Sequence, residues 1–127
     1  MLENAVLILV VEGEPIVRES VREHLEDQGY EIVEADSGEE AVTLLDKHRE
    51  ARGVIADVRL GGRHKVTGWD VARHARELNP DIAVVYMSAD SGADWTAQGV
   101  PKSILVAKPF AISQISTALA NLLNESG

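Results

Sequence analysis

The stretch "LILVVEGEP" (residues 7–15) decides how the rest of the chain is interpreted. Five apolar residues in succession, without the alternation of a half-buried strand, are typical of a parallel strand covered on both faces. The run ends at Glu12, and Pro15 suits the first position of a helix. A buried strand that leads through two acids into a helix predicts the first strand–helix unit of an α/β protein.

Three further apolar runs have the same character as this one. They read "GVIADV" (53–58), "IAVVYMS" (82–88) and "ILVA" (104–107), and the first run extends over residues 5–11. All four favour strands buried on both faces. A fifth segment, "YEIVEA" (30–35), alternates between polar and apolar residues and therefore predicts a strand nearer the edge of the sheet.

Helical spacing of apolar residues fills each gap between these runs. Helices are expected to begin at Pro15, after the capping residues Ser37 and Thr67, and near Ser91 and Ala111. Gly29 is expected to end the first of them. Five units of strand and helix require parallel strands with right-handed crossovers. The predicted class is therefore α/β, a doubly wound five-stranded parallel sheet with helices on both faces.

Composition restricts the domain organisation and the kind of partner. The chain has 127 residues, of which 45% are hydrophobic and 26% charged, which predicts one globular domain over 1–127 with no output domain. A net charge of -9 argues against nucleic acid as a partner, and the absence of cysteine excludes thiolate chemistry. Because no segment has the form of a signal peptide or a membrane span, we expect a cytoplasmic protein without membrane contacts.

Candidate functional residues stand where the predicted strands end. In an open parallel sheet, ligands bind beyond the carboxyl ends of the strands. Glu12 and Gly13 follow the first run, Asp57 lies in the third, Ser88 ends the fourth and Lys108 follows the fifth. An acid, a lone aspartate, a hydroxyl and a Lys-Pro pair at one edge outline a phosphoryl-transfer site.

Four segments carry a resemblance that covers the whole chain. In order, "LILVVEGEP", "VIADVRL", "VVYMSAD" and "VAKPF" resemble the receiver domain of two-component response regulators. The resemblance implies a flavodoxin-like fold with strand order 2-1-3-4-5 and five flanking helices. It also implies a stand-alone signalling module rather than an enzyme.

The resemblance further implies a role for three residues. Asp57 would accept a phosphoryl group from a phosphohistidine on a histidine kinase or histidine phosphotransfer protein, mainly through positioning and charge neutralisation. Lys108 would neutralise the phosphoryl oxygens, and the Ser88 hydroxyl would follow the new phosphoryl group. The Lys108–Pro109 bond resembles one that is cis in the family.

Gly13 departs from the family's pattern. That position normally holds an acid that binds Mg²⁺ together with the phospho-acceptor and a backbone carbonyl two residues beyond it. Here Asp57, the carbonyl of Arg59 and a water held by Glu12 would bind Mg²⁺ more weakly. Glu14 would supply the missing acid only by turning inward, and its charge is explained equally well by the dipole of the helix that it precedes.

The loop over residues 59–67 is longer than usual for the family. Gly61 stands where the family has a proline, and Gly68 is predicted to head the third helix. Four basic side chains occur in this loop: Arg59, Arg63, His64 and Lys65. They form either a solvated loop or a cationic flap that partly replaces the charge of Mg²⁺ beside the phospho-acceptor.

Leu105 is a further departure, because the family carries an aromatic at this place on the fifth strand. Any response to phosphorylation would then rely on the backbone between Ser88 and Gln98. Trp95 lies in that stretch, where it either anchors a partner protein or packs back on the sheet.

Two functions therefore compete. The first is a phosphorylatable receiver that signals to an unknown target by protein–protein contacts, and the intact Asp57, Ser88 and Lys108 favour it. The alternative is a degenerate pseudo-receiver that binds proteins independently of phosphorylation, which Gly13 and Leu105 favour. A haloacid-dehalogenase-like phosphatase or a flavin binder would need an aspartate pair or a phosphate-binding loop after the first strand, and "EGE" is neither.

Overall fold

The computed structural model describes residues 5–60, 66–89 and 92–126. Strands and helices alternate along these residues. The strands are β1 (Leu7–Val11), β2 (Glu31–Ala35), β3 (Gly53–Asp57), β4 (Ala83–Ser88) and β5 (Ser103–Ala107). The helices are α1 (Pro15–Asp27), α2 (Gly38–Lys47), α3 (Gly68–Leu78), α4 (Gly92–Gln98) and α5 (Ile112–Ser126). Ser91, the predicted start of the fourth helix, lies outside the described residues.

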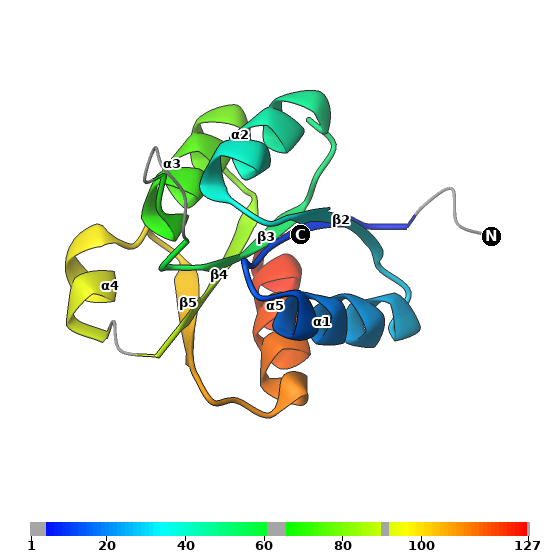
Figure 1. Cartoon of the computed structure of the whole chain (residues 1–127). Coiled ribbons are helices and arrows are strands. Elements are labelled where there is room, and N and C mark those ends of the chain that lie inside the picture. The colour runs from blue at the N-terminus through cyan, green and yellow to red at the C-terminus, as the bar shows by residue number, and fades with distance from the viewer. Residues whose placement is uncertain (1–4, 61–65, 90–91, 127) are drawn as a thin grey trace.

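The five strands form one parallel sheet in the order β2-β1-β3-β4-β5. The predicted fold class and strand order are therefore confirmed. In Figure 1, α1 and α5 lie on one side of the sheet and α2 and α3 on the other, with α4 beside the β5 edge. Each crossover thus covers one face of the sheet, which leaves the strand ends free to form a site.

The central strands are buried on both faces, as their apolar runs predict. Every residue of β1, β3 and β4 is buried. The interpretation of "ILVA" as a strand buried on both faces was wrong, because four of the five residues of β5 are partly or fully exposed. β5 lies at the edge of the sheet and pairs only with β4, so an apolar run here marks a half-covered strand.

Local signals end and begin the helices where they were expected. Gly29 has a φ of 96° and follows the end of α1, a backbone conformation that glycine adopts without strain. The Ser37 hydroxyl accepts from the backbone N–H of Glu40 at the start of α2. Thr67 and Asp70 form a reciprocal capping box at the start of α3.

The two described ends of the loop before α3 lie close together. The backbone N–H of Gly68 donates to the carbonyl of Val58 at 3.0 Å, which closes the loop behind β3. A Cβ on Gly68 would lie 2.9 Å from the Val58 Cα, so only glycine fits this approach. Gly68 heads α3 as predicted. The predicted loop residues Gly61, Arg63, His64 and Lys65 lie outside the described residues.

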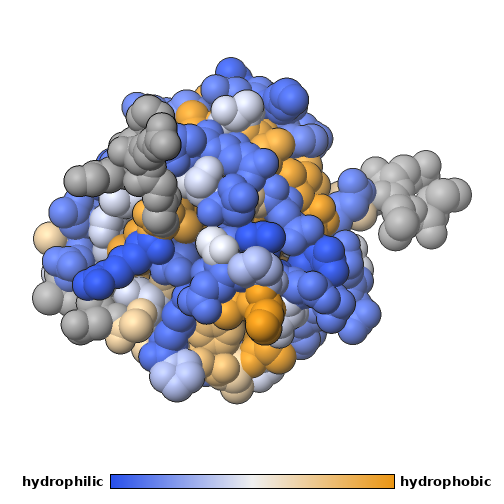
Figure 2. Space-filling view, viewed as in Figure 1, coloured by the Kyte–Doolittle hydropathy of each residue, from blue (hydrophilic) through white to orange (hydrophobic). Residues whose placement is uncertain are grey.

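The described surface is polar over most of the face shown in Figure 2, with hydrophobic side chains gathered over the start of α1 and the connection between β5 and α5. Ile16 in this region has 85% of its surface exposed. Among the described helices, none has the length and apolar character that a membrane crossing requires.

Candidate functional site

Parallel pairing brings four chain segments together at the carboxyl edge of the sheet. β1 pairs with β3, β3 with β4, and β4 with β5, so their last residues lie side by side. Glu12 follows β1, Asp57 ends β3, Ser88 ends β4 and Lys108 follows β5. The four predicted side chains therefore belong to one site.

Lys108 connects the two carboxylates of this site. Its Nζ donates to Oδ2 of Asp57 at 2.9 Å and to Oε1 of Glu12 at 3.0 Å. The Lys108 side chain has 20% of its surface exposed, whereas those of Asp57 and Glu12 have 11% and 1%. The ammonium thus lies at the mouth of the site, where it hydrogen-bonds to both buried acids, compensates one of their two negative charges and still reaches solvent.

The pKa values of Glu12 and Lys108 follow from burial and from these hydrogen bonds. Burial raises the pKa of Glu12, and hydrogen bonds from the Glu14 backbone N–H and from Lys108 oppose this effect without cancelling it. Burial alone would lower the pKa of Lys108, but its hydrogen bonds to Asp57 and Glu12 outweigh that effect and raise it. Lys108 is therefore a firmly charged ammonium at neutral pH.

Backbone groups hold the remaining carboxylate oxygens. Oδ1 of Asp57 accepts from the backbone N–H of Arg59 at 3.1 Å, and Oε2 of Glu12 accepts from that of Glu14 at 3.1 Å. Ser88 is buried, and its carbonyl accepts from the backbone N–H of Lys108 at 2.8 Å. The Lys108–Pro109 bond is cis, in agreement with the resemblance.

Gly13 leaves open space at the position where the resemblance led us to expect an acid. It is exposed, and a Cβ built on it would have the carbonyl oxygen of Asp36 as its nearest neighbour at 3.6 Å, an ordinary contact. Glu14 is also exposed and forms the N-cap position of α1, without a side-chain capping hydrogen bond. The position of Glu14 favours the interpretation in which its charge belongs to the helix terminus.

The oxygen atoms of this site fit Mg²⁺, with one carboxylate fewer than the resemblance led us to expect. Each oxygen of Asp57 and Glu12 accepts one N–H, and a carboxylate oxygen has a second lone pair to offer. Mg²⁺ is commonly held by one or two carboxylates with waters in the other positions. Within the described parts of the chain, no three His, Cys, Asp or Glu side chains converge on a metal position. Glu12 and Asp57 are the two carboxylates that meet here, and the Arg59 carbonyl as a third ligand stays a prediction.

Two features of the site escape the sequence argument. Arg18 of α1 donates from Nη1 to the backbone carbonyl of Glu12 at 2.7 Å. A depression of about 500 Å³ also lies beside Lys108, with Ile16, Val17 and Phe110 among the side chains in its wall. For the Arg18 contact, the only signal in the sequence was an arginine one helical turn after Glu14. Nothing in the local sequence indicates the depression.

Trp95 and Leu105, the two residues whose place in the sequence bears on the response to phosphorylation, pack against the hydrophobic cluster beneath α2 and α3. Trp95 is partly buried, packs against the core and donates from Nε1 to the hydroxyl of Ser103 at 3.0 Å. Leu105 is half-buried against the same cluster. The structure therefore favours the interpretation in which Trp95 packs back on the sheet.

Comparison with protein families agrees with this geometry. The family model of the response regulator receiver domain matches residues 8–120. The chain belongs to this family. It is thus a module of two-component signalling rather than an enzyme, and the receiver domains of this family are partners of histidine kinases.

Individual relatives of this receiver domain extend the comparison. A response regulator receiver protein from Sinorhizobium medicae is 35% identical, with a TM-score of 0.92 and 98% of each chain covered. The response regulator TrrA from Thermotoga maritima, solved with Mg²⁺ and BeF, is 28% identical with a TM-score of 0.78, over 92% of this chain and 98% of that one. The probable transcriptional regulatory protein TcrX of Mycobacterium tuberculosis is 30% identical over 124 residues, 96% of this chain and 51% of TcrX. The chain spans about half the length of the curated regulators it matches, and 13% of the sensor kinase CckA of Brucella abortus.

Proposed function

We propose that this receiver domain accepts a phosphoryl group on Asp57 from a phosphohistidine of a histidine kinase or histidine phosphotransfer protein. It then signals to a target protein by protein–protein contacts. The observation that carries the proposal is the ammonium of Lys108, 2.9 Å from Asp57 and 3.0 Å from Glu12 at the carboxyl edge of the sheet. A buried aspartate with a fixed cation beside it has the charge balance that phosphoryl acceptance requires.

The reaction can be written with these residues alone. A carboxylate oxygen of Asp57 attacks phosphorus, the P–N bond to the donor imidazole breaks, and the imidazole nitrogen takes that electron pair. Lys108 balances the negative charge on the phosphoryl oxygens, and the Arg59 backbone N–H keeps the carboxylate oriented. The Ser88 hydroxyl, at the end of the adjacent strand, follows the phosphoryl group after transfer.

Mg²⁺ has a secondary part in this proposal. Asp57, the carbonyl of Arg59 and Glu12, through a water, would hold the ion, which when bound supplies further positive charge to the phosphoryl oxygens. Because Gly13 provides no carboxylate, we infer weak Mg²⁺ binding. The cytoplasmic location, the single-domain organisation and a cationic role for the Arg59 side chain stay predictions.

The test is incubation with acetyl phosphate, with and without Mg²⁺, followed by intact mass spectrometry. We expect a phosphoryl adduct on the wild-type chain and none on Asp57→Ala. Asp36→Ala is the matched control, because Asp36 is an exposed acid that follows the neighbouring strand β2. It should keep the adduct. An adduct that survives in Asp57→Ala would place the phosphoryl group elsewhere and contradict the proposal.

A pseudo-receiver that binds proteins without phosphorylation is the second candidate, and Gly13 is the observation that favours it. This candidate predicts no adduct from acetyl phosphate or from a phosphorylated histidine kinase at any Mg²⁺ concentration. A circular dichroism spectrum typical of an α/β protein, together with a cooperative thermal unfolding transition, would show that such a result does not reflect a misfolded protein.

Restoring the acid tests the inferred weakness of Mg²⁺ binding. Gly13→Asp should raise the Mg²⁺ affinity about tenfold, the scale on which groups around a metal site act. The space around Gly13 accommodates the new side chain. Gly13→Asn has the same shape without the charge and is the control, and isothermal titration calorimetry is the measurement. Equal affinities of Gly13→Asp and Gly13→Asn would show that the metal position is wrong.

A further inference from the structure

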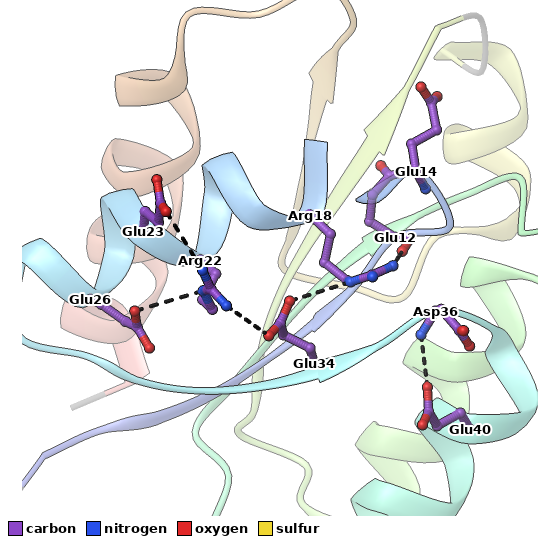
Figure 3. Close-up of polar contacts among 9 residues, drawn as sticks. All are labelled: Glu12, Glu14, Arg18, Arg22, Glu23, Glu26, Glu34, Asp36 and Glu40. Carbon is purple, nitrogen blue, oxygen red and sulfur yellow. Dashed lines mark hydrogen bonds and ion pairs between the residues drawn. The ribbon is translucent and has the colours of Figure 1, made fainter. Parts of the chain in front are cut away.

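Arg18 joins three segments of the chain next to the candidate site. From α1, its Nη1 donates to the backbone carbonyl of Glu12 at 2.7 Å, and its Nε donates to Oε1 of Glu34 on β2 at 3.3 Å. Figure 3 shows this side chain between Glu12, which follows β1, and Glu34, near the end of β2. The Arg18 side chain has 20% of its surface exposed, so these charge-assisted bonds are partly shielded from water.

The carbonyl that Arg18 holds belongs to the peptide between Glu12 and Gly13. Glycine restricts its backbone less than any other residue, so the peptide cannot take its orientation from residue 13. The next segment is tied to the same acid, because the Glu14 backbone N–H donates to the Glu12 carboxylate. A rotation of this peptide would therefore move the carboxylate that contacts Lys108.

A second arginine binds the same glutamate as the first. Arg22, one turn further along α1, donates from Nη1 to Oε2 of Glu34 at 3.3 Å, so Arg18 and Arg22 hold opposite oxygens of one carboxylate. Arg22 otherwise pairs with Glu23 and Glu26 on its own helix. Arg22 thus shares the electrostatic environment of Arg18 without bonding to the peptide of Glu12.

We propose that Arg18 is a positioning residue, which fixes the Glu12–Gly13 peptide and so keeps the Glu12 carboxylate directed at Lys108. Its side-chain bond does for this loop what a more restricted residue at position 13 would do through its own backbone. The effect on phosphorylation rests on the proposed function, whereas the effect on the loop does not.

The experiment compares Arg18→Met with Arg22→Met. Methionine keeps an apolar stem and removes the donors, and each variant loses one bond to Glu34. We expect Arg18→Met to exchange the Glu14 amide proton about fivefold faster, measured by NMR, since loss of one hydrogen bond is of that order. Phosphorylation by acetyl phosphate should slow about tenfold, because small misplacements of reacting groups carry costs of this size. Arg22→Met should leave both within about twofold of wild type.

Adding Gly13→Ala to Arg18→Met distinguishes a positioning role of Arg18 from a general contribution of Arg18 to stability. Gly13 is not among the described glycines with positive φ, and a Cβ built on it makes only an ordinary contact. Alanine therefore fits at this position and restricts the range of φ and ψ that the backbone can adopt. In the Arg18→Met background it should restore at least half of the lost amide protection and phosphorylation rate.

Three outcomes would overturn the proposal: equal effects of Arg18→Met and Arg22→Met, an unchanged Glu14 amide in Arg18→Met, or no rescue by Gly13→Ala. If the wild-type chain takes no phosphoryl group, the proposed function fails, and the amide exchange of the same variants still decides the role of Arg18.

Discussion

At the scale of single residues, the candidate site depends on one cation between two acids. Lys108 reaches across the sheet edge to Asp57 and Glu12, which lie 51 and 96 residues before it in the chain. Without the ammonium, two buried carboxylates would face each other across the ends of β1 and β3. Removing one partner of such a group leaves uncompensated charge, which costs more than the interaction contributes.

Lys108→Met should therefore destabilise the protein as well as block phosphorylation. We expect the free energy of unfolding at pH 7 to fall by about 2 kcal/mol, less than for a fully buried pair because the ammonium reaches solvent. Urea denaturation is the measurement. Lys47→Met removes an exposed lysine near the end of α2 and should change the free energy by less than about 0.5 kcal/mol. Equal effects of the two substitutions would contradict the role of Lys108.

The pH dependence of this difference has a definite sign. The pKa of Lys108 is raised in the folded state, so its stabilisation is complete below the ordinary lysine value of 10.5 and is lost as the pH rises above it. The pKa of Glu12 is also raised, so protonation starts to remove the pairing above the ordinary value of 4.5. The stability difference between wild type and Lys108→Met should be greatest near neutral pH and shrink towards both limits.

At the scale of elements, the start of α3 sets the position of Asp57. Gly68 packs directly against the backbone of β3, where a Cβ would overlap the Asp57 carbonyl oxygen and lie 3.0 Å from its carbonyl carbon. The capping box of Thr67 and Asp70 stabilises the same helix start. A loop of unusual length is compatible with an intact site because its two ends are fixed here.

Gly68→Ala should separate α3 from β3. Because the obstructing atoms are backbone, which cannot rotate away, we expect a loss of about 2–3 kcal/mol in the free energy of unfolding. Phosphorylation of Asp57 should slow as well. Gly92→Ala is the matched control, since nothing lies within 4 Å of a Cβ at that glycine. Thermal and urea unfolding of both variants measure the effect, and a Gly68→Ala protein as stable as Gly92→Ala would refute the packing argument.

At the scale of the whole molecule, β4 connects the candidate site to the edge of the sheet, where β5 and α4 lie. Ser88 ends this strand, and Tyr86, two residues earlier, packs against Trp69 with ring centroids 4.6 Å apart. The Tyr86 hydroxyl accepts from the backbone N–H of Val100 at 3.1 Å, which ties β4 to the turn before β5. Burial raises the pKa of Tyr86, so the hydroxyl stays protonated at neutral pH.

Tyr86→Phe should leave the Val100 N–H buried without an acceptor. We expect the free energy of unfolding to fall by about 1–2 kcal/mol, the cost of an unsatisfied buried donor. Tyr30→Phe is the control, because Tyr30 is only half-buried and packs against the hydrophobic cluster on the α1 and α5 side of the sheet. Amide exchange at Val100, followed by NMR, should rise in Tyr86→Phe alone. A Val100 amide that stays protected would show that the hydrogen bond is not required.

Much of this fold could be predicted from the sequence because its signals are local. The run ending in "VVEGEP" determined a buried strand and a helix start, and Gly29 and Thr67 determined helix ends through their own backbone chemistry. The positions of Glu12, Asp57 and Lys108 at the ends of strands then followed from parallel pairing. These features depend on residues a few positions apart, which a single sequence displays directly.

Only the tertiary structure decided which groups make contact. The ammonium of Lys108 lies between two acids from β1 and β3, Arg18 holds the peptide of Glu12, and Trp95 packs on the sheet rather than facing outward. β5 is an exposed edge although its letters match those of the central strands. Each of these outcomes depends on the distance between residues far apart in the chain, because hydrogen bonds and burial act through space and leave no periodic trace in the sequence.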